Sequence, residues 1–271
     1  MDISKATTPF VELFQQNRTL CTAIAATVAA GGTISIISHI VADYRAWYAL
    51  GPNGLPLNIF GYLFQSIGRS FARLDTRVPA PYDNAQLARS ARYGPLSQRS
   101  FFSGSIPSRK GARPEVPMFV GPHRQTSQQA APAMRSRQEA FLDALAAANP
   151  SLIRVRPSNL EGPLFRSVWL QSGIALRDEI KNLNGEFAHP HAEGSTHMVL
   201  SLVDAAAAIE RGWSERHRMS GVAGLMPWGF VMVYAPRDDG EFRVWREFMV
   251  ASARYVLGGD KEVVMPGNVG E

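Results

Sequence analysis

The sequence has 271 residues, of which 45% are hydrophobic and 19% are charged. This length suits one domain with an appendage, and the composition excludes wholesale disorder, a collagen-like chain and a coiled coil. There are 28 Lys and Arg residues against 23 Asp and Glu residues, a formal net charge of +5. The single cysteine, Cys21, excludes an intramolecular disulfide framework and a cysteine-based zinc cluster, and it fits a reducing compartment.

An uncharged apolar segment covers residues 19–42, a run of 24 residues without Asp, Glu, Lys or Arg. As a helix it would rise about 36 Å, enough to cross a hydrocarbon core of about 30 Å. Tyr44, Trp47 and Tyr48 follow it and are typical of a membrane interface. We predict a transmembrane anchor, with a cleaved signal peptide and a buried or interfacial helix as the alternatives. The polar lead, residues 1–18, is long for a signal peptide.

A second apolar run, residues 55–74, predicts a helix within a membrane-proximal segment over residues 43–76. This helix would lie on the membrane surface or pack on the folded domain, and both interpretations stay open. The apolar side chains at helical spacing are Ile59, Tyr62, Leu63, Ile67, Phe71 and Leu74.

The basic excess is confined to one stretch of the chain. Residues 69–137 contain 12 Lys and Arg residues against three acids, whereas the remainder contains 16 against 20. Within it, residues 77–115 are rich in Pro, Ser, Gly and Arg and poor in periodicity, which predicts an extended arm. The arm is suited either to anionic lipid headgroups or to a solvated linker. Because no nucleic-acid motif accompanies the charge, no nucleic-acid partner is expected.

Residues 116–271 have the pattern of one compact α+β domain, with a mixed or antiparallel sheet and flanking helices behind the N-terminal hydrophobic helix. Asp204 is the predicted N-cap of a short helix, because Asp is a good capping residue. The chain lacks a Walker loop and a dinucleotide-binding glycine pattern. The predicted helices are 132–148, 204–211 and 241–257, and the predicted strands are 116–120, 152–156, 165–171, 185–189, 196–202 and 229–234.

Histidines are concentrated in the domain: His189, His191, His197 and His217 fall within 29 residues. His189 and His191 would share one strand face, and a turn would bring His197 back beside them. Several imidazoles in one small volume point to chemistry, since each neutral ring needs a partner and charged rings repel. They suit proton transfer near neutral pH, with a metal site on His189, His191 and His197 as the other functional interpretation.

Two arginines and two aromatic residues accompany the histidines. Arg216 and Arg237 are candidates for binding an enolate or carboxylate, although Arg237 has an alternative ion-pair partner four residues on. Trp213 and Tyr234 are candidates for stacking on an aromatic substrate, with core packing as the alternative. Ser195 lacks the Gly-x-Ser-x-Gly elbow of a serine hydrolase.

Five blocks of this sequence resemble the signature blocks of the fungal luciferase family, in the same order. The N-terminal apolar helix occupies the place of that family's membrane anchor, so the resemblance runs from about residue 20 to about residue 257. The His-x-His pair together with the Gly-Trp-x-x-Arg-His block is the most specific combination. The blocks are DYRAWYALGPNGLPLNIFGYLF (43–64), GARPEVPMFVGPHRQTSQQ (111–129), EFAHPHAEGSTHMVLSLVDA (186–205), GWSERHRMSG (212–221) and VMVYAPRDDGEFRVW (231–245).

The resemblance implies an oxidoreductase that oxidises a 3-hydroxy-α-pyrone such as 3-hydroxyhispidin with molecular oxygen. In that chemistry a cyclic peroxide forms, carbon dioxide leaves and an excited product emits light. His189 or His191 is the expected base, with His197 and His217 polarising or orienting the substrate. Further candidate substrate-binding residues lie in the block at 111–129: Arg113, His123, Arg124 and Gln125.

No cofactor beyond O2 is expected, apart from the metal that the histidine cluster leaves open. The expected partners are a small-molecule substrate and membrane lipids around the N-terminal helix, in an endomembrane such as the endoplasmic reticulum crossed once. The interval AEGST after His191 is shorter than in bona fide luciferases and more like that of non-luminous relatives, which leaves light emission open. The alternatives are a tailoring enzyme of secondary metabolism, metal-dependent or cofactor-free, and a non-catalytic membrane-anchored binding protein.

Overall fold

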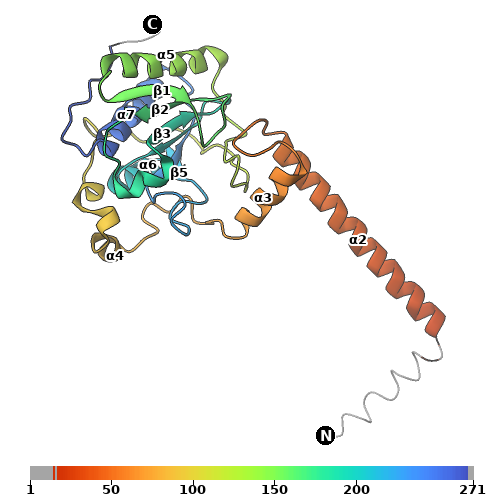
Figure 1. Cartoon of the computed structure of the whole chain (residues 1–271). Coiled ribbons are helices and arrows are strands. Elements are labelled where there is room, and N and C mark those ends of the chain that lie inside the picture. The colour runs from red at the N-terminus through yellow and green to blue at the C-terminus, as the bar shows by residue number, and fades with distance from the viewer. Residues whose placement is uncertain (1–14, 16, 268–271) are drawn as a thin grey trace. The chain divides into compact units, whose positions relative to one another are not determined.

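The computed structural model describes residue 15 and residues 17–267 (Figure 1). The chain divides into two compact units, residues 1–49 and residues 50–271. Most of the polar lead predicted for residues 1–18 lies outside the described residues.

The first unit contains the helix α2, Arg18–Tyr48, which is long and apolar enough to cross a membrane by length and composition. Its apolar side chains, such as Val28 and Ile34, are exposed. The hydroxyls of Thr22, Thr27 and Thr33 donate to backbone carbonyls four residues earlier, at 2.7–2.9 Å. These hydroxyls are therefore satisfied within the helix, as an apolar solvent requires.

The second unit is built on an antiparallel sheet of six strands in the order β1-β2-β3-β4-β6-β5. Strands β1 to β4 pair in chain order. Strand β6 then pairs with β4, and β5 forms the edge of the sheet beside β6. This confirms the predicted α+β fold with flanking helices. The strands are β1 (Ile153–Pro157), β2 (Arg166–Leu170), β3 (Glu186–Pro190), β4 (Thr196–Val199), β5 (Ser214–Arg216) and β6 (Phe230–Val233).

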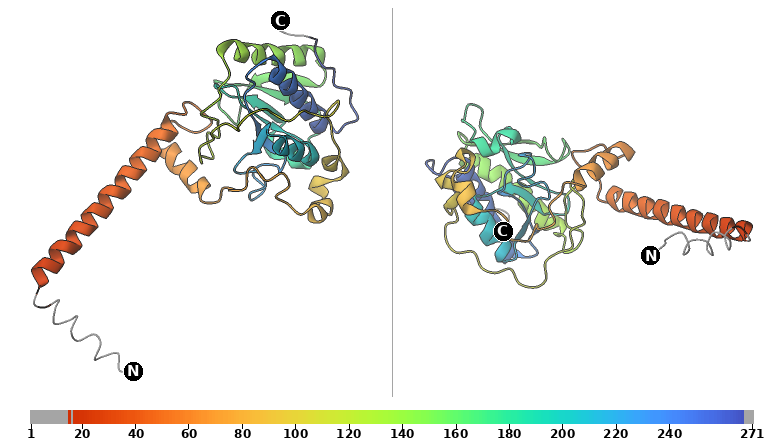
Figure 2. Two further views of the ribbon diagram at one scale, coloured as in Figure 1. Left: turned by 180° about the vertical axis from the view of Figure 1, so that it is seen from behind. Right: turned by 90° about the horizontal axis from the view of Figure 1, so that it is seen from below.

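Three helices cover one face of the sheet, α5 (Pro132–Ala148), α6 (Leu202–Glu210) and α7 (Asp239–Val256) (Figures 1 and 2). Asp238 caps α7 by accepting the backbone N–H of Glu241 at 2.8 Å. The shorter elements lie before β1 and between β2 and β3: α3 (Ile59–Arg69), α4 (Asn84–Ala88), η1 (Ala91–Tyr93), η2 (Pro95–Gln98) and η3 (Asp178–Leu183).

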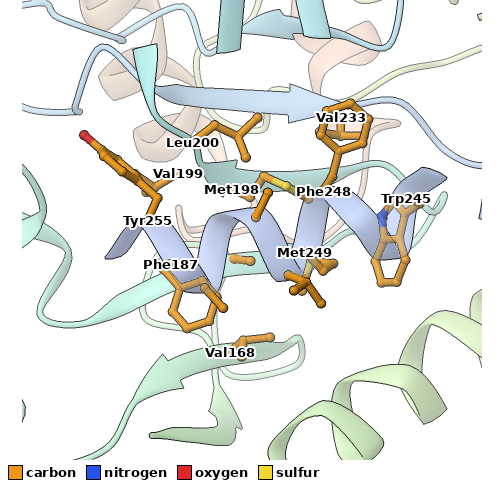
Figure 3. Packing of buried hydrophobic residues seen from close by; sticks show 14 of the residues in the cluster. Val168, Phe187, Met198, Val199, Leu200, Val233, Trp245, Phe248, Met249 and Tyr255 are labelled. Carbon is orange, nitrogen blue, oxygen red and sulfur yellow. The ribbon is translucent and has the colours of Figure 1, made fainter. Parts of the chain in front are cut away.

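The core lies between α7 and the sheet (Figure 3). Phe248 and Met249 of α7 are fully buried, as are Val168 and Met198 of the sheet. Burying each such side chain contributes about 1.5–3 kcal/mol. The indole N–H of Trp245 in α7 donates to a β4 hydroxyl at 2.9 Å, so the polar end of this ring is also satisfied.

The arm, residues 77–115, lies along the second unit rather than apart from it. Phe101 and Ile106 are buried in the core. The carboxylate of Asp204 accepts Ser100 Oγ–H at 2.6 Å and the N–H of Phe101 at 2.8 Å. The indole N–H of Trp213 donates to the carbonyl of Pro107 at 2.6 Å. Side chains of the domain thus hold the arm by its backbone.

Three local predictions are wrong. The predicted strand at 116–120 is irregular, because Pro114 and Pro117 lack the N–H groups that a strand ladder needs. The strand predicted for 196–202 ends at Val199. The helix predicted from Asp204 begins at Leu202, because Ser201 is its cap and accepts the N–H of residue 204 at 3.1 Å.

Candidate functional site

Five buried histidines gather on the sheet face opposite α7. His189 of β3 lies directly across from His197 of β4, and one row of cross-strand partners continues to Met232 of β6 and Glu215 of β5. Side chains in one row point to the same face of a sheet. The five histidines are His123, His189, His191, His197 and His217, each at most 6% exposed.

A tight hairpin returns the chain from β3 to β4. The N–H of His191 donates to the carbonyl of Ser195 at 2.8 Å, and the N–H of Gly194 donates to the carbonyl of His191 at 3.0 Å. Gly194 has φ +96°, and a Cβ there would lie 2.5 Å from the Cβ of Ala130. A glycine is therefore required where the hairpin turns, and the hairpin brings His191 beside His197.

A bulge in β3 places a carboxylate behind His189. Val168 pairs with Ala188 but Trp169 pairs with Glu186, so Phe187 is an extra residue in β3. In a regular strand, residues three apart point to opposite faces. The extra residue shifts the alternation, and Glu186 Oε1 lies 2.9 Å from His189 Nδ1.

His191 and His123, the other two histidines within hydrogen-bonding distance of His197, also have carboxylates behind them. His191 Nδ1 lies 2.8 Å from Ser195 Oγ, and this hydroxyl donates to Glu193. His123 Nε2 lies 3.4 Å from Glu215 Oε1. The same Glu215 accepts Arg77 Nε–H at 2.9 Å and the hydroxyl of Tyr234 at 3.1 Å.

These partners assign the ring protons. A carboxylate accepts only, so the Nδ1 of His189 carries its proton and Nε2 has the lone pair. The Ser195 hydroxyl donates to Glu193 and therefore accepts from His191 Nδ1, so Nε2 of His191 also has a lone pair. Both lone pairs are directed at His197.

The same reasoning assigns the ring proton of His197. His123 donates from Nε2 to Glu215, so its Nδ1 accepts from His197 Nε2, 3.1 Å away. This leaves a lone pair on His197 Nδ1, which lies 3.3 Å from His189 Nε2 and 3.0 Å from His191 Nε2. Three nitrogen lone pairs therefore converge, and they repel one another unless a proton or a metal cation lies between them.

Burial keeps the central rings neutral. Burial, followed by the neighbouring histidines, lowers the pKa of His197 and of His217 well below the ordinary 6.5. The pKa of His123 is also lowered, mainly by burial. Burial alone would raise the pKa of Glu215, but its contacts with His123 and Arg77 outweigh burial and lower it to about 2. A neutral His123 thus faces the ionised Glu215.

A mostly apolar cavity of about 370 Å³ opens on the cluster. His123, His189, His197 and His217 line it together with Phe230, while His191 lies behind the lining. This volume is in the range of small-molecule sites. The apolar walls come from segments far apart in the chain: Leu55, Phe64, Ile67, Phe71, Val120, Pro122, Leu160, Met219, Leu225 and Met226.

The structure places Arg216 on the helix-covered side of the sheet. It pairs with Val231, in the row that includes Ala188 and Met198 and faces the helices. Its guanidinium donates to the carbonyls of Trp228 and Pro79, and burial lowers its pKa to about 10. Arg216 is therefore not among the cavity-lining residues.

Arg237 and Trp213 line a different cavity, of about 910 Å³. Arg237 pairs with Glu241 and donates to the carbonyl of Lys110 at 2.7 Å. Although this second cavity is larger, it contains none of the clustered histidines. The arrangement does not bring Arg237 or Trp213 together with the cluster.

The remaining predicted substrate-binding residues hold backbone in place around the site. Arg113 donates to the carbonyls of Ser214 and Ile209. Arg124 donates to the carbonyls of Leu50 and Pro52 at 2.7 and 2.6 Å. Gln125 accepts the N–H of residue 235 at 2.9 Å. Tyr234 contacts Glu215, and burial raises the pKa of its phenol.

Sequence reasoning missed the carboxylates Glu186, Glu193 and Glu215. Glu186 and Glu193 lie within three residues of a clustered histidine, and this proximity was the available signal. Glu215 had a weaker signal. Strand alternation places Glu215 and His217 on one face and Arg216 on the other, but a strand at 214–216 was not predicted.

Two groups of three histidines have nitrogens within 4.8 Å of one another, and both include His197. One adds His189 and His191, and the other adds His123 and His217. In the second group, His197 Nε2 donates to His123 Nδ1 at 3.1 Å, so these two nitrogens already share a proton, and His217 Nδ1 accepts the N–H of Met219 at 3.0 Å. The first group is therefore the better candidate for a metal site.

Comparisons with known proteins find luciferases. Residues 184–252, which contain four of the five clustered histidines, match the family model described as luciferase domain. The luciferase of Armillaria gallica is 27% identical over 263 residues, covering 92% of this chain and 93% of that protein. The luciferase of Neonothopanus nambi is 24% identical over 228 residues, covering 79% and 80%.

No solved structure matches the chain significantly. The matches in sequence run over most of both proteins, and the domain match coincides with the histidine-bearing hairpin. The predicted resemblance is thus confirmed: residues 184–252 match the luciferase domain model, and the chain is similar over most of its length to fungal luciferases.

Proposed function

We propose that this protein is a luciferase-like oxygenase that acts on a small aromatic α-pyrone carrying a hydroxyl group, similar to 3-hydroxyhispidin. Three facts support the proposal: the relatives named luciferase, the apolar cavity of about 370 Å³, and the histidines along its wall. The convergence of three lone pairs at His197 is the observation that carries it, because a proton taken from the substrate is stabilised there.

The chemistry begins with proton removal. Nε2 of His189, which lines the cavity, accepts the proton of the hydroxyl, with His191 beside it in the cluster, and the resulting enolate is electron-rich enough to add O2. The added oxygen closes on the ring carbonyl to a cyclic peroxide, which loses CO2. Substrate and O2 thus give product and CO2, with the substrate oxidised and the oxygen reduced. No arginine lines the described cavity, so the protonated histidine itself balances the enolate charge.

The test is turnover of the full chain in detergent, with hydroxypyrone substrates under oxygen. Substrate loss, CO2 and light are followed separately. We expect His189→Gln to reduce turnover about 10²–10⁴-fold. His39→Gln, in α2 and outside the cluster, is the matched control and should keep wild-type turnover.

Light is a separate outcome of that experiment. Substrate loss and CO2 without light identify a dark oxygenase, in agreement with the short AEGST interval. If no hydroxypyrone is consumed, or if His189→Gln and His197→Gln both keep full turnover, the oxygenase proposal fails. Binding without turnover would instead support a non-catalytic relative that retains the cavity.

A second candidate is a metal-dependent enzyme, favoured by the spacing of His189, His191 and His197. Nitrogens bound to one tetrahedral Zn²⁺ at about 2.0–2.1 Å lie roughly 3.3 Å apart, and the two measured nitrogen distances are 3.0 and 3.3 Å. Carboxylates lie behind His189 and, through Ser195, behind His191, as in the usual outer shell of a metal site, whereas His197 donates to His123. A bound cation would lower the pKa of a substrate hydroxyl and so favour the enolate.

Metal analysis distinguishes the two candidates. The full chain is purified through a tag without histidine and without chelators, and zinc, iron and copper are measured. The metal candidate predicts a stoichiometric ion that His191→Gln loses and His217→Gln keeps. If all three metals are absent while turnover persists, the metal candidate is excluded and the proton-transfer role stands.

We also propose that α2 anchors the protein in an endomembrane. The support is its length, its apolar composition and its internally satisfied threonines. Replacing Val28 and Ile34 by Lys should release the protein from the membrane fraction, since each charge at the bilayer centre costs about 2.5–3.5 kcal/mol. A mass spectrum showing that the mature chain lacks residues 1–42 would identify a signal peptide instead.

A further inference from the structure

Helix α3 exposes an apolar stripe where a helix of a folded domain normally exposes polar side chains. Phe60, Phe64 and Ile67 are 74%, 67% and 65% exposed. The positions recur at helical spacing, so they form one face. The stripe consists of Ile59, Phe60, Leu63, Phe64 and Ile67 of α3 and of Phe71 and Leu74 just beyond it.

The stripe is fixed in this orientation by the other side of the helix. Gly61, Tyr62 and Gln65 are buried. At the start of α3, the side chain of Asn58 accepts the N–H groups of Phe60 and Gly61 at 3.0 and 3.2 Å. The polar and small residues of α3 thus face the domain, and its large apolar residues face away from it.

The charges near the stripe suit a lipid surface. From residue 44 to residue 74 the chain has no acidic residue, and Arg69 lies at the end of α3. Arg73, just beyond it, is ion-paired with Asp75. The stripe is also tied to the anchor by a short connection, since only residues 49–58 lie between Tyr48, the last residue of α2, and Ile59. Such a connection spans at most roughly 40 Å.

The stripe also borders the candidate site. Phe64, Ile67 and Phe71 line the histidine cavity and yet each is about two-thirds exposed. A residue with both properties lies at the mouth of a cavity. Leu225, from a segment far from α3 in sequence, is 54% exposed and has the same two properties. Two separate segments thus contribute apolar side chains to the mouth.

We propose that the α3 stripe inserts into the interface of a lipid bilayer, so that the mouth of the histidine cavity faces the lipid. An apolar substrate dissolved in the membrane would then reach the histidines without crossing water. The partner is the bilayer itself, recognised by aromatic and aliphatic side chains beside a short basic segment.

The test uses environment-sensitive fluorescence in the full chain. Cys21 is replaced by Ser, and a cysteine carrying the fluorophore is introduced as Phe60→Cys, or as Val264→Cys for the control. Val264 is 49% exposed and lies far from α3 in sequence, near the C-terminus. In vesicles of phosphatidylcholine and phosphatidylserine, we expect a blue shift and quenching by lipid-borne quenchers at position 60 only.

Two outcomes overturn the proposal. One is a probe at position 60 that is no more quenched by lipid than the probe at position 264. The other is a shift that depends on protein concentration at constant lipid, which would mean that a second copy of the chain covers the stripe.

A kinetic experiment tests whether the substrate reaches the cavity from the lipid, and it rests on the proposed function. Phe60→Glu with Leu63→Glu changes the stripe without touching the cavity lining. We expect KM for a vesicle-dissolved pyrone to rise several-fold at unchanged kcat, and both constants to stay unchanged in detergent. The control pair Val203→Glu with Val264→Glu should have no effect, and an unchanged KM for both pairs contradicts lipid-side access. If the wild type turns over no pyrone, the oxygenase proposal fails. The fluorescence experiment still tests whether the α3 stripe inserts into the bilayer.

Discussion

At the residue scale, the site depends on carboxylates that set the protonation of imidazoles. Glu186 Oε1 also accepts the hydroxyl of Ser158 at 2.5 Å, and Oε2 accepts the N–H of Asn159 at 2.8 Å. These donors hold the carboxylate against His189 and favour its ionised form, and its pKa is lowered despite burial. The reactive nitrogen of His189 is therefore selected by a neighbour that does not itself reach the cavity.

Replacing Glu186 by Gln should reduce turnover about 10–100-fold, because the amide no longer enforces one tautomer of His189. The fold should persist, since Gln has nearly the same volume. Steady-state turnover and circular dichroism check both parts. Glu139→Gln, at an exposed carboxylate, serves as the control; equal turnover in both variants would remove Glu186 from the mechanism.

The lowered pKa of Glu215 predicts that the free energy of unfolding falls at acidic pH. Its pKa is lowered from the ordinary 4.5 to about 2, so the folded chain binds its proton less readily than the unfolded chain. The stabilisation is complete above pH 4.5 and is lost as the pH falls towards 2. Each unit of pKa difference corresponds to about 1.4 kcal/mol.

Urea unfolding of the full chain in detergent at pH 5 and pH 3 measures this fall in the free energy of unfolding. We expect Glu215→Gln to flatten the fall in the free energy of unfolding between the two pH values. Glu210→Gln, at the exposed last residue of α6, should reproduce the wild-type fall. A wild-type slope in Glu215→Gln would contradict the assignment.

At the element scale, the β3–β4 hairpin is the part that brings histidines together. Gly194→Ala forces φ +96° on a residue with a Cβ and drives that Cβ against Ala130. We expect the free energy of unfolding to fall by about 1–3 kcal/mol. Gly104→Ala, with no neighbouring atom within 4 Å of the added Cβ, should change it little, and urea titration compares the two.

The bulge in β3 and the alternation in β5 explain which parts of the site the sequence could predict. His189, His191 and His197 follow from period-two alternation and a short turn, both local properties. Glu186 reaches the same face only because Phe187 is an extra residue, and a bulge depends on the pairing with β2. Arg216 was expected beside His217, but adjacent residues of a strand point to opposite faces.

At the scale of the whole molecule, the arm and the domain form one folded unit. Asp204 is buried and accepts two hydrogen bonds from residues 100 and 101 of the arm. Asp204→Ala should free this part of the arm and make trypsin cleave faster after Arg99. Asp143→Ala, at an exposed carboxylate paired with Arg166, is the control. Equal cleavage in both variants would show that other contacts hold the arm.

The sequence by itself determined most of the elements and the chemistry of the cluster: α5, α7, the strands β1–β4 and β6, the apolar helix α2 and four histidines on neighbouring segments. These follow from periodicity and composition, which act over a few residues. Only the tertiary structure decided that His123 and Glu215 complete the cluster, that Arg216 and Arg237 lie away from the cavity, and that the apolar face of α3 points outward. Each of these depends on pairing between segments far apart in the chain, and local periodicity contains no information about which distant segment will cover a given face.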